Sequence, residues 1–346
     1  MKPTFHPDLK AIPEYEAIVA GQKMPSSFNG WHWCDEDGWT LAHYAAVHGS
    51  QLPGDFQSWD WKTKGGMSVI YLLFRNGHAL PEGFSQWGLT SLMGRTAAHD
   101  AAQAGQLPRD FDQWHLCTKT KWTVAHEEAL HRGQLPADFD GWAWKDNDGR
   151  TVAHIHAQNH GRHKKGAPRI PSDFAGWLDT DVYDRTVAEF AALSRYCLPD
   201  TFKAWDAILR GGRRLIDLII ENSAPLPASF DAWDIEDRDG VNVAVRRLQT
   251  GVPLPEHFNA WSLADKSGWT VAHEWMKSSP ADARLPASLT DLALWHLVDH
   301  RGDRVIDVAR RHGRNSLVAW YEQHAIEAQL DTPSPSLPTR ISRPLL

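Results

Sequence analysis

The chain has 346 residues, of which 42% are apolar and 23% charged, and this composition is ordinary for a soluble folded protein. Its net charge of −7 argues against a dedicated nucleic-acid binder, because such proteins carry a strongly basic face. No apolar run approaches the ~18 residues that span a bilayer, and the first residues lack the apolar core of a signal peptide. The three cysteines, Cys34, Cys117 and Cys197, form no CxxC pair, which favours a reducing, cytoplasmic location.

The predicted regular structure begins with a helix over residues 12–21, which has the spacing of the first helix of a repeat. From Met24-Pro25 onward, a Leu-Pro or Ile-Pro dipeptide recurs, in most steps every 28 residues. A step of 35 residues, between Leu135 and Ile170, marks an insertion of seven residues. Such a period indicates a repeat architecture. The dipeptides begin at Leu52, Leu80, Leu107, Leu135, Ile170, Leu198, Leu226, Leu254 and Leu285.

An aromatic pair follows nearly every dipeptide, with phenylalanine three residues after the proline and tryptophan three residues later. Proline suits the first turn of a helix, so each dipeptide is predicted to open a short helix with both rings on one face. The tryptophans are then predicted to form a buried column through stacked units. This tryptophan column consists of Trp31, Trp59, Trp87, Trp114, Trp142, Trp177, Trp205, Trp233, Trp261 and, after a slip in spacing, Trp295.

The other half of each unit is predicted to be a tight turn and a helix of two to three turns. In one copy Asp148-Gly149 makes the turn and Thr151 caps the helix. Glycines then occupy the position after the helix, at Gly49, Gly77, Gly105, Gly133, Gly161 and Gly313. Neither helix buries its apolar stripe alone, so stacking is required.

These elements predict an all-α, helix-turn-helix repeat solenoid with terminal caps. We expect residues 1–330 to form a single solenoid of about ten repeats. Residues 315–329 are predicted to be a longer final helix, and the Pro- and Ser-rich residues 331–346 a disordered tail.

The pattern Thr-x-x-His after the turn resembles the ankyrin repeat, with copies at Thr40/His43, Thr96/His99, Thr123/His126, Thr151/His154 and Thr270/His273. The resemblance covers nearly the whole chain. It departs from the family because Val, Leu or Ala replaces the proline after the threonine, and because the period is about five residues shorter than the usual 33. The chain is therefore similar to an atypical short array, as in some bacterial proteins; a separate helical-hairpin solenoid is the alternative. The resemblance implies a protein-binding scaffold.

The histidines of this pattern are predicted to hydrogen-bond their own turns and caps, because neighbouring helices lie too far apart for successive copies to share a metal ion. A denser group, His154, His156, His160 and His163, leaves open weak metal chelation. The Asp-rich segments 35–38 and 146–149 favour turns over calcium loops, because no bidentate Glu follows. We predict no metal, no cofactor and no catalytic site.

The predicted partner-binding residues stand just before the helix caps, at the turn tips. Trp and Arg dominate interface hot spots, and these positions are occupied by Trp39, Arg95, Trp122, Arg150, Arg185, Arg213 and Trp269, here called the turn-tip ladder. The alternative is that these stems only cover the neighbouring turn. A second candidate surface is the helix face beside the histidines, with Tyr44, Asp100, Glu127, Arg246 and Glu274. The insertion forms a basic loop, either a docking site or a solvated segment, with Arg162, Lys164, Lys165 and Arg169.

The function predicted from these observations is that of a monomeric scaffold that binds a protein partner. The first alternative is a module for a small ligand or carbohydrate that stacks on exposed tryptophans. The second is an enzyme whose site has no recognisable motif. The location is expected to be cytoplasmic, or that of a delivered bacterial effector without a classical signal peptide.

Overall fold

The computed structural model describes residues 2–81, 84–90, 94–163, 168–237, 239–280 and 283–330. Its contacts divide the chain into two compact units. Unit 1 comprises Met1–Thr201 and Leu209–Gly212, and unit 2 comprises Phe202–Ile208 and Arg213–Leu346. The expected tail, residues 331–346, lies outside the described residues, and the expectation of a single solenoid stays a prediction.

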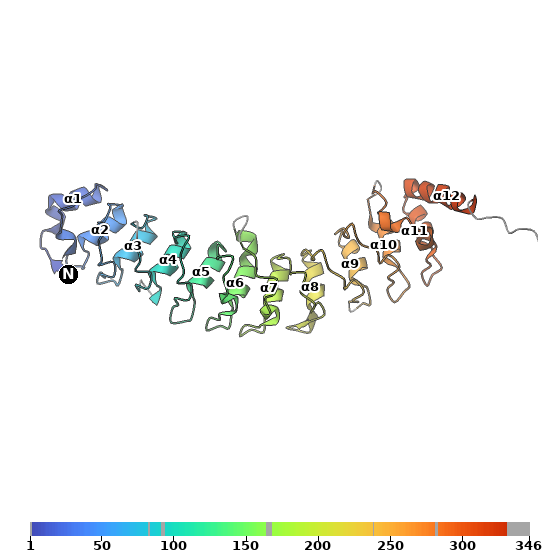
Figure 1. Ribbon diagram of the computed structural model, residues 1–346, viewed down its shortest axis with the longest axis horizontal. Helices are drawn as coiled ribbons and strands as arrows, with labels where there is room; N and C mark the ends of the chain where they lie inside the picture. Colours follow the sequence, from blue (N-terminus) through green and yellow to red (C-terminus); the bar gives the residue numbers. More distant parts are fainter. Residues whose placement is uncertain are drawn as a thin grey trace, which may run out of the picture. The chain divides into compact units, whose positions relative to one another are not determined.

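Each unit is a row of short α-helices in which consecutive helices pack against one another (Figure 1). Unit 1 contains α1 (Pro13–Val19), α2 (Leu41–His48), α3 (Val69–Arg75), α4 (Ala97–Ala104), α5 (Val124–His131), α6 (Val152–Asn159) and α7 (Val187–Leu193). Unit 2 contains α8 (Leu215–Glu221), α9 (Val243–Gln249), α10 (Val271–Ser278), α11 (Val305–Arg311) and α12 (Asn315–Leu330). The prediction of an all-α repeat architecture is confirmed, as are the first helix and the longer final one.

Strands and 3₁₀ turns are short. The strands are β1 (Thr4–Phe5), which pairs in parallel with β2 (Trp33–Cys34), and β3 (Ile208–Leu209), which pairs with β4 (Arg213–Arg214). The 3₁₀ turns that lie entirely within the described residues are Leu9–Ala11, Gly30–His32, Gly141–Ala143, His160–Arg162, Gly176–Leu178, Ala287–Leu289 and Leu292–His296. The part of the chain that the structure describes contains no helix that is both long and apolar enough to cross a membrane.

The helices start where the threonines predict. At α5, the Thr123 hydroxyl accepts a hydrogen bond from the His126 backbone N–H, at 3.2 Å. The first two helical N–H groups, of Val124 and Ala125, donate to carbonyls of the preceding segment, those of Leu116 and Trp114. Donors that a helix leaves unpaired are thus satisfied by its own repeat.

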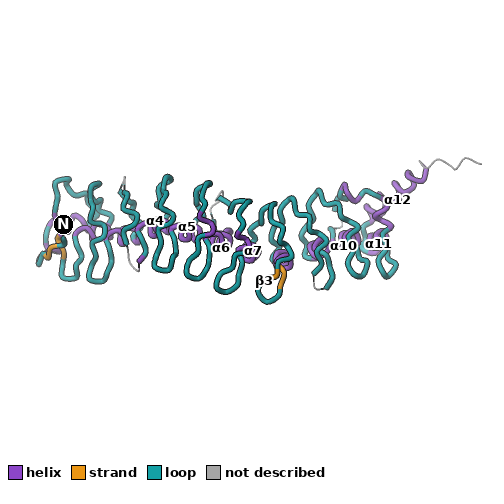
Figure 2. Tube along the Cα trace, turned by 60° about the horizontal axis from the view of Figure 1, so that its bottom comes forward, coloured by secondary structure: helices purple, strands orange, loops and turns teal. Residues whose placement is uncertain are grey.

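The prediction of a second, shorter helix in each repeat is wrong. After Pro136, the chain makes one turn closed by the Phe139 N–H and the Pro136 carbonyl, at 3.2 Å, and then a 3₁₀ turn over Gly141–Ala143. The segment is short, and starting a helix fixes several residues for one hydrogen bond, so an isolated turn is the cheaper structure. Figure 2 shows these connections as loops beside the helices. Gly161 also differs from prediction, since it lies within the 3₁₀ turn His160–Arg162.

The tryptophan column is buried, as predicted. Nine of its ten members are at most 9% exposed, and Trp114 is half-buried. Phenylalanine and tryptophan rings alternate edge to face: in unit 1 Trp59 meets Phe84 at 5.7 Å, and in unit 2 Trp205 meets Phe230 at 5.0 Å between ring centroids. Five tryptophans of the column contact the phenylalanine of the next repeat in this way, which gives those neighbouring repeats a shared aromatic core.

Candidate functional site

The turn tips are held by a buried carboxylate. In one copy, Asp146 Oδ1 accepts hydrogen bonds from the backbone N–H groups of Asp148 and Arg150, both at 2.9 Å. Asp146 is only 7% exposed. The same arrangement occurs at Asp35, Asp181, Asp237, Asp265 and Asp299. The prediction that the Asp-rich segments are turns is confirmed, and their carboxylates fix the backbone of the residue at the tip.

The five histidines of the Thr-x-x-His pattern are buried, and their rings are neutral. His154 Nδ1 accepts a hydrogen bond from the Thr151 backbone N–H, at 3.0 Å, so the proton of the neutral ring resides on Nε2. That Nε2–H donates to the Arg185 carbonyl, 3.1 Å away in the next repeat. Burial lowers the pKa of His154, and it lowers the pKa of His126 to about 4, which keeps both rings uncharged at neutral pH.

This contact between repeats, here called the histidine clamp, recurs at five positions. The predicted hydrogen bonds to the cap are confirmed, while the bond to the next repeat was not predicted. Its acceptors are the carbonyls of Trp61, Trp122, Arg150, Arg185 and Asp303. The clamp positions the turn tips, because in four of the five copies the acceptor is the tip residue itself.

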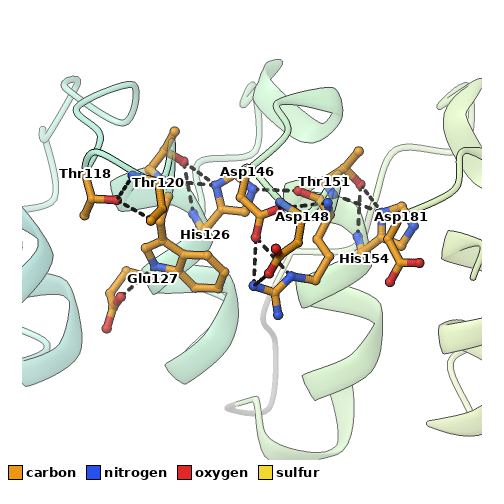
Figure 3. A network of polar contacts seen from close by, with 12 residues as sticks. Thr118, Thr120, His126, Glu127, Asp146, Asp148, Thr151, His154 and Asp181 are labelled. Carbon is orange, nitrogen blue, oxygen red and sulfur yellow. Dashed lines mark hydrogen bonds and ion pairs between the residues drawn. The ribbon is translucent and has the colours of Figure 1, made fainter. Parts of the chain in front are cut away.

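The best-ordered part of the turn-tip ladder lies in unit 1. The Arg150 guanidinium carbon lies 5.4 Å from the Trp122 ring centroid, and Arg150 also pairs with Asp146 at 2.8 Å. The Trp122 indole N–H donates to Glu127 Oε2 at 2.8 Å. Arg95, from the preceding repeat, reaches the same carboxylate at 3.1 Å. Trp and Arg side chains of three repeats are thereby joined into one half-exposed network (Figure 3 shows its middle part).

The remaining ladder residues are half-exposed and individually anchored. Arg185 pairs with Asp181 at 2.6 Å and stacks 5.0 Å from the exposed Tyr183 ring. In unit 2, the Trp269 indole donates to Glu274 at 2.9 Å. Trp39 packs against Tyr44 in unit 1, and Arg213 pairs with Glu221 in unit 2. All of these side chains are partly exposed to solvent.

The second candidate surface needs correction. Asp100, Glu127 and Glu274 are 7%, 3% and 2% exposed, so they do not face a partner. They lie beneath ladder residues and hold them. Burial opposes ionisation of Glu127, but the hydrogen bond and charge of Arg95 outweigh it and lower its pKa. The sequence alone did not reveal this role because each carboxylate bonds to a turn-tip residue five positions earlier, a spacing at which helical side chains do not meet. Arg246, the basic member of this set, pairs with Asp237 and Asp239.

The histidine-rich insertion does not form a metal centre in the part of the chain described. There, no group of three or more His, Cys, Asp or Glu side chains is placed to hold an ion. His156 is instead fully buried, with its ring centroid 4.5 Å from that of His163. Of the predicted basic loop, Arg162 and Arg169 are exposed, and Arg169 lies over Tyr196. Lys164 and Lys165 lie outside the described residues.

Comparison with known proteins gives little beyond this geometry. No protein-family model matches the chain, and no curated protein matches it. Among solved structures, the chain is similar to the crystal structure of the ankyrin repeat domain of Bcl-3, described there as a unique member of the IkappaB protein family. The match has 14% identity, covers 82% of this chain and 99% of that one, and has a TM-score of 0.19. A TM-score this low carries no argument, so the assignment of a helical repeat fold rests on the helices of this chain and their contacts.

Proposed function

We propose that the chain is a non-enzymatic scaffold whose turn-tip ladder binds a protein partner. The observation that carries this proposal is the network around Trp122 and Arg150 in unit 1. Both side chains are half-exposed, and both are fixed from below by carboxylates, those of Glu127 and Asp146. Trp and Arg that are already ordered lose little conformational freedom on binding, which favours them as interface anchors.

Adjacent tip residues extend this surface. Val182 and Tyr183 are 59% and 54% exposed, unlike the polar tips of neighbouring repeats, and Arg185 stacks on Tyr183. An aromatic and aliphatic pair beside arginines has the composition of an interface core with a polar rim. The surface therefore offers apolar area and oriented hydrogen-bond donors together.

The test replaces Trp122 and Arg150 with Ala together. Partners recovered from the native cell with the tagged wild-type chain are identified, and the affinity of each for both proteins is measured by calorimetry. We expect the double variant to keep its helical circular dichroism and to lose affinity by about tenfold or more. The exposed pair Lys203 and Asp231 of unit 2 serves as the matched control. Unchanged affinity in the double variant would remove the ladder from the interface.

A second candidate function, the binding of a sugar or another flat ligand, is favoured by a hollow that the Trp122 ring helps to line. A hollow of about 490 Å³ adjoins that ring and is lined by polar side chains as well as Leu130. Intrinsic fluorescence titrated with a panel of glycans and metabolites distinguishes the two functions. Saturable quenching by one of them, abolished in Trp122→Ala, favours this second candidate.

A further inference from the structure

The face formed by α3, α4 and α5 carries two neighbouring hollows. One, of about 370 Å³, is lined by Tyr71, Phe74, Arg75, Asp100, Gln103 and Ala104. The other, of about 490 Å³, includes Arg95, Gln103, Lys119, Trp122, Leu130 and His131. Gln103 lines both hollows, so they adjoin each other beside the turn-tip ladder and are together called the groove here.

The two carboxylates that line this groove are both paired with the same arginine. Arg95 holds both carboxylates, with Nε 2.9 Å from Asp100 Oδ1 and a terminal nitrogen 3.1 Å from Glu127 Oε1. Both carboxylates are buried, so they present little negative charge to the groove. Arg95 therefore pairs with both carboxylates and offsets one of their two negative charges.

Two cations are left over. Arg75 is exposed and contacts only the Tyr71 hydroxyl and ring, and Lys119 is exposed; within the described residues neither forms an ion pair with a carboxylate. His131, on the same wall, shares Glu127 with Arg95. A chain of net charge −7 thus has a groove with surplus positive charge.

We infer that this groove takes an acidic segment of a protein partner, with one apolar side chain anchored beside Trp122 and Leu130. The inference rests on the proposed scaffold function and names the chemistry of its partner. Carboxylates of the segment would pair with Arg75 and Lys119, while the anchor covers the indole. Asp100 and Glu127 are already paired with Arg95, and Trp122 and Leu130 offer apolar surface. Both features favour a peptide over a nucleic acid, because the repeated phosphates of a nucleic acid require more cations.

The test uses two short fluorescein-labelled peptides with a central leucine, one rich in Glu and Asp and the other with Lys at those positions. Fluorescence polarisation with the full chain is expected to show the acidic peptide binding at least about tenfold tighter, and more weakly as salt is raised. The double variant Arg75→Glu/Lys119→Glu should weaken binding by about tenfold. Lys266→Glu, at the corresponding tip in unit 2, is the matched control and should bind like the wild type.

Equal binding of both peptides, or no effect of the double variant, overturns the inference. So does tighter binding of a single-stranded oligonucleotide than of the acidic peptide. Circular dichroism establishes that each variant is folded. If the acidic peptide does not bind while Trp122→Ala/Arg150→Ala still loses affinity for a native partner, the scaffold function stands. Only the inference of an acidic partner segment is then rejected.

Discussion

The Nε2 atom of His126 donates a hydrogen bond to the carbonyl oxygen of Arg150, 3.1 Å away in the next repeat, while its Nδ1 accepts from the Thr123 backbone. One buried ring therefore joins a helix cap to the following turn tip. Neither ring nitrogen has access to water, and removing the ring leaves the buried Thr123 N–H without the acceptor that it has in the folded chain.

His126→Ala is expected to destabilise unit 1 by about 2–4 kcal/mol, because it leaves a cavity as well as unpaired polar groups. Urea unfolding followed by circular dichroism measures the loss. His48→Ala, an exposed histidine at the end of α2, is the control and should change stability by less than about 0.5 kcal/mol. A loss at His126 no larger than at His48 would contradict the clamp.

Trp59→Ala is expected to cost about 3–5 kcal/mol, since the ring is 2% exposed and meets a phenylalanine on either side, Phe56 and Phe84. Trp144→Ala provides the comparison, because that ring is 36% exposed and should give less than half of this loss. Thermal unfolding of both variants measures the two losses of stability. Similar losses would mean that the tryptophan column does not form the core.

Mild acid is expected to destabilise unit 1. Burial lowers the pKa of His156 to about 3, and its neighbours His160 and His163 act in the same direction. Below the ordinary value of 6.5 the unfolded chain takes up a proton that the folded chain cannot, so stability falls as pH decreases from about 6.5 towards 3. The His156 ring also contacts the rings of Trp142 and Tyr196, and Arg169 lies over Tyr196.

The measurement compares urea midpoints at neutral and mildly acidic pH for the wild type and His156→Phe. The variant should lose less stability on acidification, because one proton-linked group has been removed. His115→Phe, at an exposed site, should follow the wild type. The other clamp histidines keep part of the pH dependence in both variants, so a difference in slope is the informative quantity.

Asp146→Ala is expected to loosen the turn that presents Arg150. It removes the acceptor of two backbone N–H groups and the partner of the guanidinium, at a cost of about 1–3 kcal/mol. Hydrogen exchange at the Arg150 amide should accelerate. Asp148→Ala is the control, because that carboxylate is 55% exposed and its ion pair with Arg150 contributes less than about 1 kcal/mol. Equal effects of the two changes would argue against the turn's role.

The sequence allowed the helices and the core to be predicted where the signal lies within one repeat. Thr123 marks a cap and Trp59 a buried position because their spacing repeats. The prediction of a helix after Pro136 was wrong because proline opens isolated turns as readily as helices. The length of the segment that follows decides which of the two forms. The roles of Glu127 and Asp100 were missed because Arg95 lies 32 residues before Glu127 and five before Asp100, and neither separation is the three or four residues at which helical side chains meet.

The histidine clamp also bears on how such a chain can grow. Its acceptor lies 24 residues after His126 but 31 residues after His154, where the insertion falls, yet both bonds measure 3.1 Å. Geometry at the junction is thus independent of how much polypeptide separates donor from acceptor. We therefore expect that a new segment inserted between Asn159 and Ile170 leaves this hydrogen bond intact, which would make the site suitable for grafting a foreign peptide.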